Sequence, residues 1–180
     1  MVADRTSPHT MVPRYSGAER RTRRLCVLAF VLLTQLAAGC IGATLPSTDI
    51  PDNDDTRAIH AKVLAYKEAM NARDTDAIMA LVSHRYYENG GTTETDRDDY
   101  GYEKLRDEVL PRLRQNVKAV HYQVIFRRTE IDTDRAYADY EFFSRFQYVE
   151  GGREAWDQNN DFNRLEFRRE EGEWMIVAGL

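Results

Sequence analysis

The chain has 180 residues, 42% of them hydrophobic and 31% charged, so it can hold one globular domain of ordinary size. Its formal net charge at pH 7 is −5, and residues 1–39 contain six arginines against two acids, which leaves −9 for the remainder. Because so acidic a surface repels the phosphates of nucleic acids and of anionic lipids, we expect no nucleic-acid partner.

The chain begins with a basic segment and an uncharged apolar run. Residues 20–24 include four arginines, and residues 25–38 carry no charge. A bilayer span needs about 20 apolar residues, so this run is too short to span and is typical of a signal-peptide core. Both Met1 and Met11 are compatible with it as the start of the chain.

The apolar run ends in Leu36-Ala37-Ala38-Gly39-Cys40. Small residues directly before a cysteine resemble the lipobox of bacterial lipoproteins, although an alanine stands where leucine is commoner. The resemblance implies thioether-linked diacylglycerol on the sulfur of Cys40, cleavage of a signal peptide formed by residues 1–39, and acylation of the new amino group. Several acyl chains hold a protein durably on a bilayer. The alternative is ordinary secretion with an incidental cysteine.

The residue after this cysteine bears on the membrane in which the protein is expected to reside. In Gram-negative lipoproteins an aspartate there usually causes retention at the inner membrane, and this chain has Ile41. The resemblance therefore implies a cell-envelope protein anchored in the outer membrane and facing the periplasm. Cys26 would leave with the signal peptide and Cys40 would be lipidated, so no thiol remains for a disulfide, a metal site or a nucleophile.

The next segment is expected to be a flexible tether, from the lipidated cysteine through residue 56. Residues 41–54 combine Pro46 and Pro51 with Ser, Thr and Asp and have no apolar period. A folded domain is expected over residues 57–180.

The domain begins with two predicted helices that fold back on each other. The first has an apolar stripe at intervals of three and four residues, formed by Ile59, Val63, Tyr66 and Met70. Asp55 and Thr56 can cap its start, and Asp74 is expected to cap the second helix. The buried side of the second helix is expected to comprise Ile78, Leu81 and Val82.

A short strand and a third helix are expected next. Tyr86-Tyr87-Glu88 predicts the strand, and the following Asn89-Gly90-Gly91 predicts a turn. The acids between residues 94 and 99 resemble a calcium loop, but the glycine falls two places late and the closing glutamate is missing. We instead expect Asp98 or Asp99 to cap a helix kinked at Pro111. Its apolar stripe comprises Tyr102, Leu105, Val109 and Leu113.

From Ala119 the apolar period changes to two. Turn sequences at residues 132–134, 151–152 and 171–173 predict three consecutive hairpins and therefore a four-stranded antiparallel sheet. The polar run 159–161 indicates either a bulge or polar groups that enter the interior. The apolar face is expected to carry Val120, Tyr122, Val124, Phe126, Ala136, Ala138, Tyr140, Phe142, Ser144, Phe146 and Tyr148. Helices must cover this face, which predicts an α+β fold with three N-terminal helices on one face of a curved antiparallel sheet.

This order of elements resembles the cone-shaped nuclear transport factor 2-like superfamily. The segments 63–66 and 71–81 are similar to its steroid delta-isomerase branch, which is related to the polyketide cyclases. The superfamily contains isomerases, dehydratases and domains without a known reaction. The resemblance also implies a homodimer through the sheet.

The resemblance implies three site residues. Tyr66 stands where the steroid isomerases have a tyrosine that donates to the developing oxyanion. Their catalytic carboxylate falls on Gly90 without gaps, and a shift of two places brings Glu88 onto it. Asn163 replaces a protonated aspartate, and an asparagine can donate a hydrogen bond but cannot be tuned as an acid. Against these roles, Tyr66 can be an ordinary core tyrosine, Glu88 a solvated carboxylate and Asn163 the partner of a buried group.

Because this set of catalytic groups is incomplete, the sequence favours a domain that binds a small apolar ligand or an envelope protein without catalysis. The alternative is an isomerase or dehydratase with Glu88 as base and Tyr66 and Asn163 as oxyanion donors. No cofactor or metal is expected, since His84 and His121 lack a second ligand at a suitable spacing. The predicted pocket is lined by Tyr66, Tyr122, Tyr140, Phe142, Asn163 and Leu165.

Overall fold

The structure is a computed structural model that describes residues 42–90 and 98–180. The predicted signal peptide, the lipidation site Cys40 and most of the acidic segment considered as a calcium loop lie outside these residues. Among the helices that the structure describes, none is long and apolar enough to cross a membrane.

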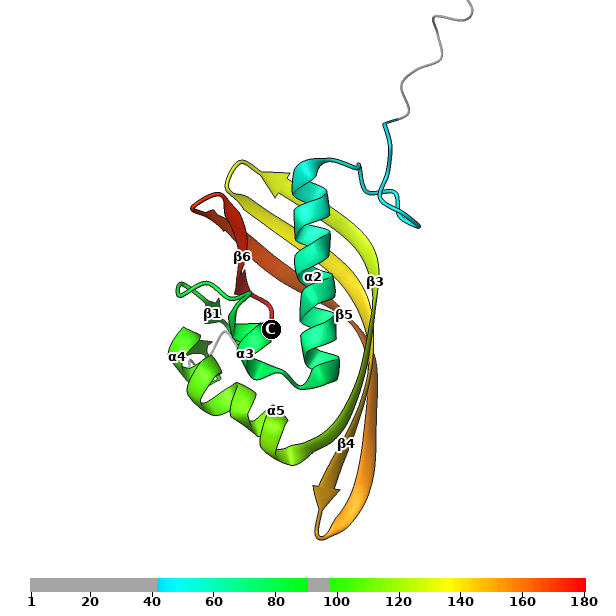
Figure 1. The fold of residues 1–180 in the computed structure, drawn as a ribbon, viewed down its shortest axis with the longest axis vertical. Helices are drawn as coiled ribbons and strands as arrows, with labels where there is room; N and C mark the ends of the chain where they lie inside the picture. The colour runs from blue at the N-terminus through cyan, green and yellow to red at the C-terminus, as the bar shows by residue number, and fades with distance from the viewer. Residues whose placement is uncertain (1–41, 91–97) are drawn as a thin grey trace, which may run out of the picture. The chain divides into compact units, whose positions relative to one another are not determined.

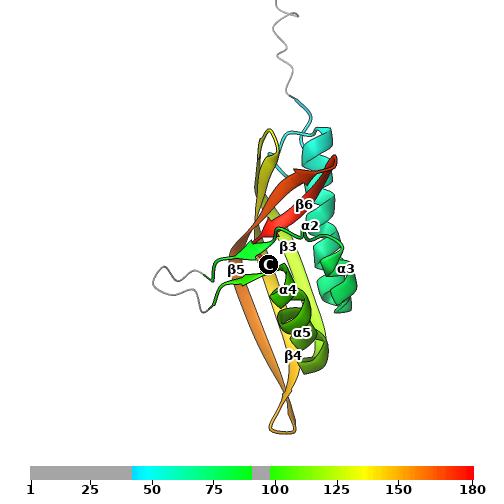
Figure 2. The same ribbon diagram turned by 90° about the vertical axis from the view of Figure 1, so that its left-hand side faces the viewer.

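The described chain is an α+β unit, as predicted. Strands β3 to β6 form a four-stranded antiparallel sheet in sequence order, and β1 pairs with β2 in a separate two-stranded sheet. Helix α2 lies across the concave side of the curved sheet (Figure 1), and the helices lie on one side of it (Figure 2). The elements are α2 (Asp54–Ala72), α3 (Thr75–Met79), β1 (Tyr87–Glu88), β2 (Tyr100–Gly101), α4 (Tyr102–Lys104), the π-helix η1 (Leu105–Val109), α5 (Leu110–Asn116), β3 (Val117–Asp132), β4 (Arg135–Glu150), β5 (Arg153–Glu170) and β6 (Glu173–Ala178).

Helix α2 begins slightly earlier than predicted. Asn53 is the N-cap, and its side-chain oxygen accepts a hydrogen bond from the backbone N–H of Thr56 at 2.9 Å. The Thr56 hydroxyl in turn accepts one from the Asn53 N–H at 3.0 Å, which completes a capping box. Asp55 therefore is not the cap. The prediction of Asp74 as N-cap of α3 is confirmed, since its carboxylate accepts from the Ala77 N–H at 2.9 Å.

The segment before α2, predicted as a flexible tether, contains a turn closed by its own backbone hydrogen bonds over residues 43–52. The Asp52 N–H donates to the Ala43 carbonyl at 2.7 Å, and the Leu45 N–H donates to the Ile50 carbonyl at 2.9 Å. Leu45 and Ile50 are each only 4% exposed. Burial of these two apolar side chains stabilises the turn, and the polar composition around them hides this signal in the sequence.

The third helix is divided by a π-turn at its proline. Pro111 has no N–H, and its ring would collide with the carbonyl oxygen four residues earlier. The chain relieves this conflict with η1, where the N–H of Leu110 reaches back five residues to the Leu105 carbonyl. The extra residue in this turn places Leu110 in the core together with Leu105. The expected interruption is therefore a π-turn, and it shifts the buried side of the helix.

The predicted cap of this helix is wrong. The N-cap of α4 is Gly101, which makes no side-chain capping hydrogen bond. The Asp99 carboxylate instead accepts hydrogen bonds from the Gly90 N–H at 3.2 Å and from the Tyr87 hydroxyl. It thereby joins the ends of the loop between β1 and β2.

The three predicted hairpins of the sheet are all present, and β4 and β5 stay in register without a break from Arg135↔Arg168 to Glu150↔Arg153. The polar run in β5 is therefore not a bulge. Asn159 pairs with Ser144 and Asp161 with Phe142, so both lie on the concave side of the sheet. Both side chains are exposed there, so the alternative that polar groups enter the interior is wrong as well.

The outer face of the sheet also carries apolar side chains. Ile125, Phe143, Trp156 and Phe162 are all more than 40% exposed there. The homodimer implied by the resemblance remains a prediction, and this is the face on which it would pack.

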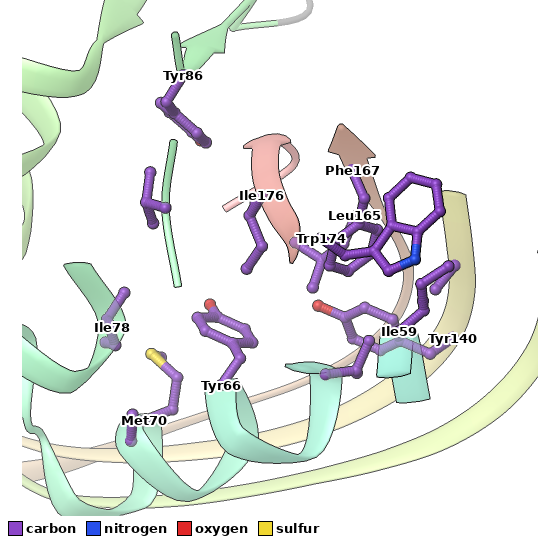
Figure 3. Packing of buried hydrophobic residues seen from close by; sticks show 14 of the residues in the cluster. Ile59, Tyr66, Met70, Ile78, Tyr86, Tyr140, Leu165, Phe167, Trp174 and Ile176 are labelled. Atoms are coloured by element: carbon purple, nitrogen blue, oxygen red, sulfur yellow. The ribbon is translucent and has the colours of Figure 1, made fainter. Parts of the chain in front are cut away.

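The core forms where α2 meets the sheet. The four stripe residues of α2 are buried in one cluster with Tyr122, Tyr140, Leu165, Phe167 and Ile176. Figure 3 shows Tyr66 of α2 and Tyr140 of β4 pointing into this common interior. The predicted contact between the first helix and the sheet is confirmed.

Each end of α2 is also tied to the sheet by polar contacts. The Asn71 side chain accepts from the Tyr122 N–H at 2.7 Å and donates to the Tyr122 carbonyl at 3.0 Å. At the other end, the Asp55 carboxylate accepts from the Arg169 guanidinium at 2.5 Å and from the Trp174 indole N–H at 3.2 Å. These contacts fix both the position and the direction of the helix.

The Asp55 contact generates a pH-dependent prediction. The hydrogen bonds from Arg169, and then from Trp174, hold the pKa of Asp55 below its ordinary value. A lowered folded-state pKa adds stability above the unfolded pKa, which is about 4, and this contribution is lost as the pH falls through the folded pKa. Asp55→Asn should therefore lower the free energy of unfolding at pH 7, by less than about 1 kcal/mol because the side chain is partly exposed to solvent.

The measurement is urea unfolding of both proteins at pH 7, 5 and 3. The difference between them should shrink at the lowest pH. Asp54→Asn is the control, because this carboxylate is 99% exposed and forms an ion pair with Arg57 within the same helix. An equal loss of stability at all three pH values would show that Asp55 acts through packing and not through its charge.

Candidate functional site

Two of the three predicted site residues meet on one backbone unit. The Glu88 carboxylate, at the end of β1, accepts a hydrogen bond from the Gly179 N–H at 2.7 Å. Asn163 of β5 donates from its side-chain amide to the Gly179 carbonyl at 2.8 Å. The segment that follows β6 thus brings together side chains that lie 75 positions apart in the sequence.

The hydroxyl groups of two tyrosines hydrogen-bond the backbone of the next residue, Leu180. The Tyr86 hydroxyl accepts from the Leu180 N–H at 3.1 Å and donates to the Glu88 carboxylate at 2.8 Å. The Tyr100 hydroxyl donates to the Leu180 carbonyl at 3.0 Å. The side chain of Leu180 is half-buried against the core. We call these four side chains, Tyr86, Glu88, Tyr100 and Asn163, the mouth residues.

An open pocket of about 590 Å³ lies beside these contacts. Glu88, Asn163 and Gly179 all take part in its wall. Its complete lining is Tyr87, Glu88, Asn89, Asn163, Arg164, Glu166, Ala178 and Gly179. Ligand sites commonly combine a concavity with a few convergent polar groups, so this is the candidate site.

Most of the other predicted pocket residues do not line this pocket. They are buried in the core beside it, and we call this buried group the floor. Tyr140 and Leu165 are fully buried, and Tyr122 is 5% exposed. The hydroxyl oxygens of Tyr122 and Tyr140 are 3.4 Å apart, and the ring of Tyr122 stacks on Phe142 with centroids 5.5 Å apart. Asn163 links this floor to the mouth, because its amide also donates to the Tyr140 hydroxyl at 2.9 Å.

Tyr66 belongs to the same interior, with its ring edge-on to Tyr122 at a centroid distance of 5.9 Å. Burial raises the pKa of Tyr66, Tyr122 and Tyr140, because a phenolate would lose its hydration. These hydroxyls therefore remain protonated at neutral pH and can donate hydrogen bonds.

The hydroxyl of Tyr66 has no hydrogen-bond partner among the described residues. In this part of the chain, every fully enclosed polar side-chain atom does have a partner. The Tyr66 hydroxyl must therefore border space that a water molecule can reach, although the residue as a whole is only 6% exposed. It is an available donor inside the domain.

Four further residues belong to the site and were not predicted from the sequence: Tyr86, Tyr100, Gly179 and Leu180. Tyr86 lies two residues before Glu88, so the alternation of a strand could have placed both on one face. Strand β6 ends at Ala178, and the chain changes direction at Gly179, which has a φ of +95°. A single glycine before the last apolar residue was the available signal for this change of direction.

The described residues contain no group of three or more histidine, cysteine, aspartate or glutamate side chains that could hold a metal ion. The mouth itself has one carboxylate, one amide and two phenols. Such a set can bind the donors and acceptors of an organic ligand, and its one carboxylate could also accept a proton.

Comparison with solved structures identifies the fold. A conserved protein from Planctomyces limnophilus matches 69% of this chain and 92% of its own, with a TM-score of 0.59 and 20% identity. An aromatic ring hydroxylase, so described provisionally, from Novosphingobium aromaticivorans matches 70% of this chain and 86% of its own, with a TM-score of 0.58 and 21% identity. A ketosteroid isomerase-like protein from Erwinia carotovora atroseptica matches 71% and 95%, with a TM-score of 0.57 and 18% identity.

The chain has the nuclear transport factor 2-like fold. No family model and no curated protein matches its sequence. In this nuclear transport factor 2-like domain, the three predicted site residues fall into two groups. Glu88 and Asn163 lie at the pocket, whereas Tyr66 lies in the core and is hydrogen-bonded to neither of them.

The different environments of two interior tyrosines generate a prediction. Tyr140→Phe removes the acceptor of the Asn163 amide and the neighbour of the Tyr122 hydroxyl, and should cost about 1 kcal/mol of stability. Tyr66→Phe removes a hydroxyl without a partner among the described residues and should change stability by less than about 0.5 kcal/mol. Urea unfolding at pH 7 measures both. An equal loss in the two variants would mean that Tyr66 makes a hydrogen bond that matters to the fold.

Proposed function

We propose that this protein is a lipid-anchored component of the bacterial cell envelope whose domain binds a small, partly apolar ligand without converting it. The observation that carries the proposal is the convergence of Glu88 and Asn163, from different elements, on the same backbone unit at the edge of a pocket. Polar groups from separate elements that converge in this way are typical of recognition sites.

The surroundings of these groups support a ligand with an apolar part. Leu180 places an apolar side chain against the core at the mouth, and Tyr86 beside it is only 2% exposed. The Tyr66 hydroxyl supplies a further donor in the interior. A ligand bound here would meet the fixed polar contacts of the pocket wall, with apolar side chains of the core next to them.

The same geometry favours binding over catalysis. One oxygen of the Glu88 carboxylate already accepts two hydrogen bonds, from Tyr86 and Gly179. Asn163 cannot act as an acid, and Tyr66 is not hydrogen-bonded to either residue. A general base must reach the proton that it removes, and an oxyanion site needs donors that converge on one point.

The alternative is an isomerase or dehydratase in which Glu88 is the base and Tyr66 and Asn163 stabilise the oxyanion. The fold that this chain shares with a ketosteroid isomerase-like protein supports a reaction of that class. In that case the Gly179 segment would have to leave Glu88 before each turnover.

A ketosteroid assay separates these alternatives. A 4-ene-3-ketosteroid titrated into the ¹⁵N-labelled protein should shift amide resonances around residues 86–89 and 178–180, because these segments border the pocket. Isomerisation of the corresponding 5-ene-3-ketosteroid, followed by ultraviolet absorbance, should stay at the uncatalysed rate. Turnover that disappears in Glu88→Gln would instead establish the enzyme. The absence of any shift with ketosteroids and with other apolar probes would contradict a ligand-binding role.

The anchor is supported by the sequence alone. The basic segment, the short apolar run and the small residues before Cys40 together match a lipoprotein signal. With a net charge of −9 on residues 40–180, the protein has little electrostatic attraction to an anionic bilayer, so the lipid would provide the attachment. Ile41 supports the outer membrane over the inner one.

A cysteine substitution tests this anchor. Cys40→Ser should abolish incorporation of radiolabelled palmitate and move the protein from the membrane fraction to the soluble periplasmic fraction. Cys26→Ser is the matched control and should leave both unchanged, because this residue lies within the predicted signal peptide. A Cys40→Ser protein that still incorporates palmitate would contradict lipid anchoring at this residue.

A further inference from the structure

The segment after β6 is held in the manner of a bound ligand. Pairing between β5 and β6 ends at Glu166↔Ala178, so the backbone beyond that point has left the sheet ladder. Each of the four backbone polar groups of Gly179 and Leu180 is hydrogen-bonded by a different side chain. These side chains are the four mouth residues, and they come from β1, β2, β5 and the residue before β1.

The order of the contacts follows the order of groups along a peptide. From Gly179 N–H to Leu180 C=O, the partners are the Glu88 carboxylate, the Asn163 amide, the Tyr86 hydroxyl and the Tyr100 hydroxyl. The first and third accept a hydrogen bond, and the second and fourth donate one. This alternation of acceptor and donor is complementary to the N–H and C=O of a glycyl residue followed by the N–H and C=O of the next residue.

The position of the Gly179 Cα, which we call the seat, accepts only a carbon atom that carries no side chain. Its φ of +95° lies in the region that favours glycine, and a Cβ at this position would lie 1.9 Å from the carbonyl oxygen of Arg164. The obstacle is backbone of β5, which a side-chain rotation cannot remove. A ligand in this seat must therefore carry an unsubstituted carbon between its N–H and its C=O.

We infer that the ligand class of this site is a secondary amide of the glycyl type with an adjacent apolar side chain, and that Gly179 and Leu180 occupy the ligand's place in this structure. This inference rests on the proposed function, since it names the ligand of the same pocket. An ester of the same shape lacks the N–H from which Glu88 accepts a hydrogen bond. Sites that hydrogen-bond a ligand N–H discriminate strongly against analogues without it, because a buried polar group is then left unpaired.

The chain's own segment competes with such a ligand. Because it is covalently attached, its effective concentration at the mouth is on the order of millimolar or more. A free ligand should bind measurably better once this segment is displaced. The single substitution Gly179→Ala should displace it, since the added methyl group cannot fit against Arg164.

The experiment uses the full chain in detergent and the probe N-acetyl-glycyl-leucine amide, titrated and followed by NMR. Gly179→Ala should bind this probe at least roughly tenfold more tightly than the unsubstituted protein. Gly172→Ala is the matched control, because Gly172 has a φ of +92° but open space around the added carbon. It should carry a similar backbone strain and leave the affinity unchanged.

Two analogues of the probe test the chemistry of the seat on the Gly179→Ala protein. An ester that replaces the glycyl N–H by oxygen should bind roughly tenfold more weakly, because Glu88 loses a charge-assisted hydrogen bond. N-acetyl-alanyl-leucine amide should not bind measurably, because its methyl group meets the Arg164 carbonyl. Equal binding of the ester and the amide would overturn the inference.

A second variant covers the case in which Gly179→Ala does not fold. Leu180→Asp keeps the glycine but places a charge against the core, and it should release the segment and raise the affinity for the probe in the same direction. If ketosteroids bind but the glycyl amide binds none of these proteins, the inference fails and the proposed function stands. If neither class of probe binds any of them, both fail.

Discussion

The fixed position of α2 on the sheet is the constraint on which the rest of the domain depends. An asparagine near one end of the helix and an aspartate near the other hold it by hydrogen bonds to β3, β5 and β6. Between these points the apolar stripe excludes water from the concave face. A single polar tie would leave the helix free to pivot, whereas two ties and a stripe determine one orientation. The interior tyrosines and the floor beneath the pocket are consequences of that orientation.

The domain places its polar groups in two layers above this helix. The deeper layer consists of the phenols of Tyr66, Tyr122 and Tyr140, whose burial keeps them protonated. The outer layer contains the Glu88 carboxylate. Asn163 connects the layers, since its amide bonds both the Tyr140 hydroxyl and the Gly179 carbonyl. A ligand bound at the mouth would therefore be coupled to the core through one side chain.

The elements could be predicted from the sequence because their signals are local. The stripe of α2, the alternation in β3 and β4 and the glycine and aspartate turns each depend on residues a few positions apart. The candidate site was only partly predictable. A resemblance pointed to Glu88 and Asn163, but the residue that joins them is 91 positions from one and 16 from the other. The periodicity of apolar residues within a short segment cannot predict a contact between residues so far apart in the sequence. The turn over residues 43–52 was missed for a related reason, since two apolar side chains in a polar segment give no period at all.

The unequal lengths of β5 and β6 have a consequence for the solution behaviour of the protein. β6 pairs only with Glu166–Glu170, so the N-terminal half of β5, from Arg153 onward, is an edge that no described strand covers. An uncovered edge of this length is a template on which a second chain can add a strand. The sequence there, Asp-Gln-Asn-Asn-Asp at residues 157–161, is poor in β-formers, and its two carboxylates would face like charges in an antiparallel self-pairing centred on residue 159. This composition protects a long, open edge against aggregation between copies of the chain.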